Sequence, residues 1–102
     1  MIGKLEELVL AASMRAGSEA VANDIYGYVL NGHPKIAFGA VYTTLTRLVK
    51  KKLIDETGIT DDQGRQRRGF TINGGGRNAL QEALEASAKV GGWKIGGEYG
   101  LA

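Results

Sequence analysis

The segment from Phe38 to Ile54 constrains the fold more than any other part of the chain. With a period near 3.6 residues, Val41, Leu45 and Leu48 form one apolar stripe of a helix. A second face is small, hydroxyl-bearing and basic, and comprises Gly39, Thr43, Thr46 and Lys50, with Tyr42 and Arg47 on its flanks. No acid occurs between Lys35 and Lys52, whereas a solvated helix face usually mixes Glu with Lys. The pattern favours contact with nucleic acid over a lysine-rich helix end that merely matches the helix dipole.

The basic charge is concentrated in one third of the chain. The net charge of the 102 residues is only +2. From position 35 to 68, however, there are eight basic residues against four acids. Such a local excess is the footprint expected of a protein that binds a polyanion.

Composition excludes several other classes of protein. The chain is long enough for one domain with a modest core. It has no cysteine and one histidine, so we expect no disulfide, no metal site and no cofactor. No apolar run approaches the roughly 20 residues of a membrane span, and the N-terminus lacks the layout of a signal peptide. We therefore expect a cytoplasmic protein without membrane contact.

The first half of the chain reads as three helices. The first is expected over 4–15, ends at Gly17, and buries Leu5, Leu8, Val9 and Ala12. The second is expected from an N-cap at Ser18 to about Leu30, with a buried stripe of Val21, Ile25, Tyr28 and Val29. A turn at His33-Pro34 leads to a short extended piece, and the third helix covers about 38–51.

After the third helix the hydrophobic period changes from 3.6 to 2. Residues 53–57 and 68–72 read as two strands, joined by a polar loop in which Gly64 supplies a left-handed position. The returning side of this hairpin carries Arg65, Arg67 and Arg68. Asn73 is a good N-cap for a fourth helix to about residue 90, and the tail over 91–102 reads as loose.

Three helices followed by a basic hairpin predict a mainly α fold with a small β-hairpin wing, a winged helix-turn-helix. Residues 1–73 would form this DNA-binding unit, and residues 74–90 a C-terminal helix that dimerises. The third helix would enter a major groove of double-stranded DNA, where Gly39 and Ala40 let the backbone come close. Arg67 or Arg68 would contact the DNA backbone from the wing.

The sequence resembles the PadR-like family of transcriptional regulators over roughly residues 3–85. The matching segments are Leu5–Leu10, Gly39–Leu45, Arg47-Leu48, Lys50–Ile54, Gly64–Arg68 and Gly76-Arg77. The resemblance implies a prokaryotic, dimeric repressor that is commonly released by a small-molecule effector, with Tyr42 and Thr43 near the DNA backbone. One departure concerns the turn after the third helix, where the family usually has Lys-Gly-Leu and this chain has Lys51-Lys52-Leu53.

The resemblance places a dimer interface on the C-terminal helix. Its seam is short for an obligate dimer and comprises Ala79, Leu80, Ala83, Leu84 and Ser87. Leu5 and Val9 of the first helix would enlarge it. Trp93 is either a tail residue that packs on its own domain or the aromatic partner of a planar effector.

Several residues keep two interpretations. The candidate DNA contacts are Gly39, Ala40, Tyr42, Thr43, Thr46, Arg47, Lys50, Lys51, Arg65, Arg67 and Arg68. Arg47 would either contact phosphate or pair with Asp55 or Glu56, and Glu6 reads as a solvated position.

An enzyme is disfavoured because no nucleophile–base pair or phosphate-binding lysine loop is recognisable. The main alternative is a winged-helix module whose basic face binds an acidic protein.

Overall fold

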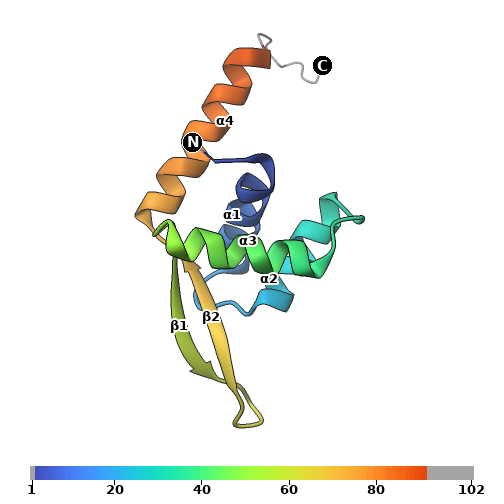
Figure 1. Cartoon of the computed structure of the whole chain (residues 1–102), viewed down its shortest axis with the longest axis vertical. Helices are drawn as coiled ribbons and strands as arrows, with labels where there is room; N and C mark the ends of the chain where they lie inside the picture. Colours follow the sequence, from blue (N-terminus) through green and yellow to red (C-terminus); the bar gives the residue numbers. More distant parts are fainter. Residues whose placement is uncertain (1, 92–102) are drawn as a thin grey trace.

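The computed structural model describes residues 2–91 as four helices and one hairpin (Figure 1). In chain order these are α1 (Lys4–Ala16), α2 (Ala22–Gly32), α3 (Phe38–Lys50), β1 (Ile54–Thr60), β2 (Gln66–Ile72) and α4 (Gly74–Gly91). The two strands are antiparallel, with Ile54 opposite Ile72 and Thr60 opposite Gln66. The hairpin extends away from the helices at one end, and α4 extends away at the other (Figure 1). The winged helix-turn-helix predicted from the sequence is confirmed.

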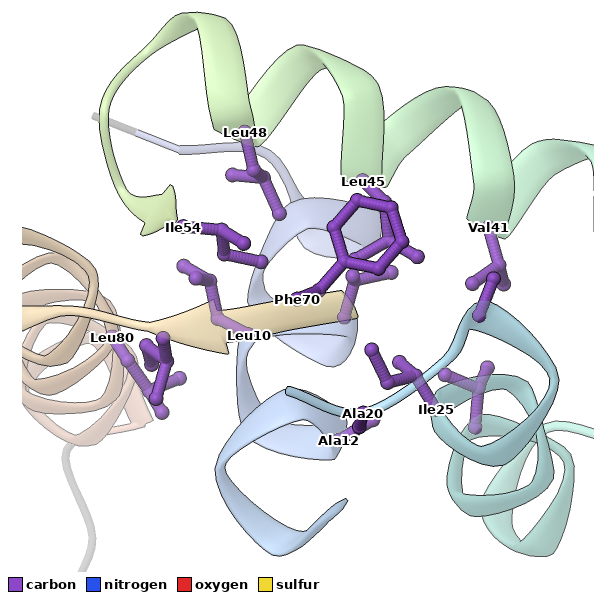
Figure 2. Packing of buried hydrophobic residues seen from close by; sticks show 14 residues of the cluster. Leu10, Ala12, Ala20, Ile25, Val41, Leu45, Leu48, Ile54, Phe70 and Leu80 are labelled. Carbon is purple, nitrogen blue, oxygen red and sulfur yellow. The ribbon is translucent and has the colours of Figure 1, made fainter. Parts of the chain in front are cut away.

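The core lies between α1, α2, α3 and the base of the hairpin, and Leu80 of α4 also belongs to it (Figure 2). The predicted stripe of α3 is confirmed, since Val41, Leu45 and Leu48 are fully buried. Phe70 of β2 is also fully buried and belongs to the same cluster as Leu45 (Figure 2). The amphipathic pattern of α3 therefore determines which of its faces remains outside.

The second helix begins later than the sequence suggested. Its N-cap is Val21, so the prediction of Ser18 as the cap is wrong. The reason is a long-range backbone pairing: Ala20 N donates to Phe70 O at 3.1 Å, and Phe70 N donates to Ala20 O at 2.9 Å. This pairing keeps Ala20 in a β-bridge and Val21 extended, so that α2 begins only at Ala22. Ser18 and Glu19 form a turn before it. The turn expected at Pro34 is present, and Ala37 after it has the expected extended backbone, with φ of −77° and ψ of 150°. Within the described residues this short piece pairs with no strand.

Two burial predictions for α1 and α2 are also wrong. Tyr28 is exposed rather than buried, and its ring lies 5.4 Å from the guanidinium carbon of Arg15. Leu10, which the predicted stripe omits, is fully buried. A helix packed on several neighbours buries more than one stripe, which accounts for Leu10. The other stripe residues Val9, Ala12, Ile25 and Val29 are buried as predicted.

The wing is longer and its loop tighter than predicted. The strands extend to Thr60 and from Gln66, leaving only residues 61–65 as the loop. The Asp61 carboxylate accepts hydrogen bonds from the backbone N–H groups of Gln63 (3.0 Å) and Arg65 (2.9 Å). These bonds lower the pKa of Asp61. Gly64 has φ of 79°, the left-handed position expected of it.

Asn73 joins α4 to the rest of the domain. Its Oδ1 accepts from Gly76 N at 3.0 Å, as the predicted N-cap requires. Its Nδ2 donates to Lys52 O at 3.1 Å and to Asp55 Oδ1 at 3.0 Å. One side chain thus fixes both the start of α4 and the turn between α3 and β1.

Lys52 occupies a position that glycine would suit better. Its φ is 63°, and a non-glycine residue in the left-handed region costs about 1–2 kcal/mol. Glycine would remove this cost, but its greater freedom in the unfolded chain offsets part of the gain. We therefore expect Lys52→Gly to raise the free energy of unfolding by about 0.5–1 kcal/mol. Urea denaturation followed by circular dichroism measures this change. Lys50→Gly, inside α3, is the control and should lower the stability by about 1 kcal/mol; equal effects at both positions would contradict the argument.

In the part of the chain that the structure describes, no helix is long and apolar enough to cross a membrane.

Candidate nucleic-acid interface

The exposed face of α3 gathers the side chains that the sequence singled out. Tyr42, Thr43, Thr46, Arg47 and Lys50 line a single surface hollow. Gly39 and Ala40 are exposed on the first turn of the same helix. Within residues 2–91, Arg47 and Lys50 form no ion pair. Among these residues neither cation has a carboxylate within ion-pair distance, although the charge of Arg47 helps to lower the pKa of Glu6.

The hydroxyl groups of α3 are not equivalent. Thr44 is buried and donates to Ala40 O at 2.7 Å. The half-buried Thr46 donates to Tyr42 O at 3.2 Å. Thr43 is exposed, and its hydroxyl has no hydrogen-bond partner within the described residues. Thr43 is consequently the hydroxyl of this face that is most available to a ligand.

Lys51 contacts another helix of the same chain. Its Nζ lies 2.7 Å from Glu6 Oε2, and Glu6 is buried rather than solvated, which corrects the sequence interpretation. Burial raises the pKa of Glu6, but the hydrogen bonds from Lys51 and from Gly3 N outweigh burial, so that its pKa is lowered. Lys51 thus ties the end of α3 to α1 and is less available to DNA than Lys50.

The wing arginines all have carboxylate partners. Arg65 Nε lies 3.0 Å from Asp61 Oδ2, and Arg65 Nη2 donates to Gln63 Oε1 at 2.6 Å. Arg67 Nη1 lies 3.5 Å from the same Asp61 oxygen. These exposed ion pairs are weak in water, and the contact of Arg67 is the longest of them.

Arg68 is held more firmly than the other two. Its Nε and Nη2 donate to the two oxygens of Glu56 at 2.5 and 2.9 Å, and its Nη1 donates to the hydroxyl of Tyr42. The hydrogen bond from Arg68 lowers the pKa of Glu56. Glu56 is therefore not the partner of Arg47, and Asp55 contacts Asn73 instead. Of the two interpretations of Arg47, the pairing with Asp55 or Glu56 is therefore not found among the described residues.

Sequence reasoning did not identify Glu56 and Asp61 as the partners of the wing arginines. The signal lay in the strand register. Gly58 is directly opposite Arg68, and Glu56 precedes Gly58 by two residues in the same strand. The side chains of Glu56 and Arg68 therefore lie on the same face of the hairpin. That register could be assigned only once both strand ends were known.

The residues predicted for a dimer interface divide into two groups. Val9 and Leu80 are buried in the core of the single chain, which corrects their assignment to a seam. Leu5, Ala79 and Ala83 are half-buried, and Leu84 and Ser87 are exposed, with 54% exposure for Leu84. A groove between the N-terminus and α4 is lined by Ile2, Glu7, Ala79, Glu82, Ala83, Ala86 and Ser87.

Trp93, the predicted effector contact, lies outside the described residues, so the effector remains a prediction. Among residues 2–91, no group of three or more His, Cys, Asp or Glu side chains is placed to hold a metal ion.

Comparisons with known proteins agree with this fold. The sequence pattern of the transcriptional regulator PadR-like family matches residues 21–82. A PadR-like transcription factor from Bacteroides fragilis is 30% identical, with 80% of each chain covered and a TM-score of 0.62. A PadR family regulator from Clostridium difficile is 17% identical, with coverage of 86% of this chain and 91% of that chain and a TM-score of 0.74.

A third similar structure is Bacillus subtilis PadR in complex with operator DNA. It is 19% identical and has a TM-score of 0.67, and the match covers 79% of this chain and 46% of that chain. A comparison with curated protein sequences gave no match. Because the family pattern covers more than half of the chain, this protein belongs to the PadR-like family of transcriptional regulators.

Proposed function

We propose that this protein is a cytoplasmic transcriptional repressor that binds a palindromic operator as a homodimer. In each subunit, α3 enters the major groove and the wing contacts the adjacent DNA backbone. The observation that carries the proposal is the acid-free, exposed face of α3 with Arg47 and Lys50 unpaired among the described residues. The complex of Bacillus subtilis PadR with operator DNA, whose fold is similar, supports this assignment.

The two surfaces differ in what they would contribute. Thr43 and Thr46 are short side chains on α3 that would reach base edges and give sequence preference. Arg47 and Lys50 would contact phosphates and give salt-dependent affinity. From the wing, Arg67 is the best candidate for a phosphate, because its only ion pair within residues 2–91 is the 3.5 Å contact with Asp61.

Dimerisation is supported by the surface of α4. Leu84 is exposed, and Ala83 and Ala86 line the groove beside it. An apolar strip of this kind on a helix that extends beyond its own domain (Figure 1) would be covered by a second copy of the chain. The two α3 helices would then read half-sites one helical turn, or a multiple of it, apart.

The test is fluorescence anisotropy with duplex DNA from upstream of the protein's own gene. A scrambled duplex is the control, and both are titrated at several salt concentrations. We expect a preference of about a thousandfold or more for the upstream duplex, together with a steep salt dependence. Equal and weak binding to both duplexes would favour the alternative, in which the basic face of α3 binds an acidic protein.

The cations of α3 make a separate prediction. Arg47→Ala and Lys50→Ala should each weaken binding to every duplex and reduce the slope of log K against log salt by about 0.9. The same anisotropy titration measures the slope. Lys89→Ala removes one charge from an exposed site on α4 and should leave the slope unchanged. If Lys89→Ala changes the slope as much as Arg47→Ala does, α3 is not the contact surface.

A further inference from the structure

Arg68 lies where three elements meet. It belongs to β2, its carboxylate partner Glu56 belongs to β1, and its hydroxyl partner Tyr42 belongs to α3. Among the described residues, the bond to Tyr42 is the only hydrogen bond between α3 and a strand of the hairpin. The wing otherwise projects from the domain (Figure 1). Arg68 therefore provides the hydrogen-bonded link between the wing and the helix proposed to read DNA, in addition to the hydrophobic core that the two elements share.

The guanidinium group of Arg68 has a carboxylate partner and lies near two aromatic rings. Nε and Nη2 form a bidentate pair with Glu56, the geometry in which arginine binds a carboxylate most strongly. The guanidinium carbon lies 5.1 Å from the centre of the Tyr42 ring and 5.0 Å from that of Phe70, within the range of a cation–π contact. A phosphate could bind the N–H groups of Arg68 in this geometry only by displacing Glu56 or Tyr42 from them.

Arg67 provides the contrast within the same strand. Successive residues of a strand point to opposite faces, so Arg67 and Arg68 lie on different faces of the hairpin. Arg67 has one ion pair, at 3.5 Å, among the described residues. Its guanidinium group can turn to a phosphate at little cost. That of Arg68 would lose its contacts with Glu56, Tyr42 and Phe70.

We propose that Arg68 is a positioning residue and not a DNA contact: together with Tyr42 and Glu56 it fixes the angle between α3 and the wing. The proposal rests on the proposed function, since the fixed angle allows α3 and Arg67 to reach groove and backbone simultaneously. It changes the role of Arg68, which the sequence analysis listed as a candidate contact of the DNA backbone. Preorganisation of this kind increases affinity because less motion is lost on binding.

The first test measures the angle without DNA. The chain has no cysteine, so Lys35→Cys and Asp62→Cys, both at exposed positions outside this cluster, would carry a unique pair of spin labels. The labelled chain is mixed with an excess of unlabelled chain to suppress distances between subunits. Pulsed electron resonance then gives the distance distribution between the helical part and the wing tip.

The variants are chosen so that charge and packing can be separated. The double variant Glu56→Gln/Arg68→Gln leaves the net charge unchanged, and Tyr42→Phe removes only the hydroxyl acceptor. We expect the double variant to broaden the distance distribution, Tyr42→Phe to broaden it less, and the control Arg67→Gln to leave it narrow. Circular dichroism confirms that each variant is folded before it is measured. A narrow, unchanged distribution in the folded double variant would overturn the proposal.

The second test uses the salt dependence of binding to a fixed duplex. The double variant should bind about tenfold more weakly with an unchanged slope of log K against log salt. Arg67→Gln should lower the slope by about 0.9. A loss of about 0.9 in the double variant would identify Arg68 as a phosphate contact and overturn the proposal. If the wild-type chain binds no duplex, the proposed function fails, whereas the spin-label distances still decide whether Arg68 fixes the wing.

Discussion

Replacing Gly76 with alanine is expected to lower the free energy of unfolding by about 3 kcal/mol, at the upper end of the usual effect of overpacking. A Cβ atom at this position would lie 2.2 Å from the carbonyl oxygen of Leu53 and 2.8 Å from Cγ1 of Ile72. The first of these atoms belongs to the backbone and has no rotamer that moves it aside. The first turn of α4 must therefore shift away from Leu53, which also strains the hydrogen bond from Gly76 N to Asn73.

The neighbouring glycines supply a matched control for this prediction. A Cβ atom at Gly74 would have no atom within 4 Å, and alanine is favoured over glycine in a helix by about 1 kcal/mol. Gly74→Ala should therefore be neutral or stabilising. Urea denaturation of the two variants side by side measures the difference. Similar stabilities for Gly76→Ala and Gly74→Ala would show that the close approach of α4 to Leu53 does not exist in solution.

Replacing Leu84 with glutamate is expected to give a monomer that binds its operator about a hundredfold or more weakly. The reason is that two linked binding units gain about 10²–10⁴ in affinity over one. Leu84 is 54% exposed in the single chain, so the substitution should leave the monomer folded. It places a charge in the apolar strip that we propose to be the seam between subunits, where burial of an unpaired charge is strongly unfavourable.

Sedimentation equilibrium gives the mass, which should fall from twice 10.8 kDa to 10.8 kDa in Leu84→Glu. Anisotropy with the upstream duplex gives the affinity of the same samples. Asn78→Glu adds one acid to an exposed site about 120° around α4 from Leu84 and should leave both mass and affinity unchanged. A dimeric Leu84→Glu variant would place the subunit interface elsewhere.

The sequence predicted most of the architecture because the relevant signals are local. The stripe of Val41, Leu45 and Leu48 and the N-cap Asn73 each act within a few residues. Their patterns follow from the geometry of a helix or a turn, so they could be read without knowledge of the rest of the chain. The family resemblance was confirmed by the match over residues 21–82.

The start of α2 was mispredicted because a distant segment decided it. Ser18 is a good cap by type, but the backbone pairing of Ala20 with Phe70 keeps the chain out of the helix until Ala22. Two backbone hydrogen bonds to a buried strand outweigh one side-chain cap. A sequence shows that a residue is able to cap a helix, and not which competing partner lies nearby.

In the candidate site, too, some features follow from the sequence and others only from long-range contacts. The sequence by itself determined that α3 has an acid-free basic face, that a basic wing follows, and that the chain is a winged helix-turn-helix. Only the tertiary structure decided which cations have partners: Lys51 contacts Glu6, 45 residues away, Arg68 contacts Glu56 and Tyr42, and Arg47 and Lys50 have no ion pair within residues 2–91. Charge and periodicity are properties of the chain, whereas a salt bridge depends on the distance between two side chains, which is known only when the elements are packed.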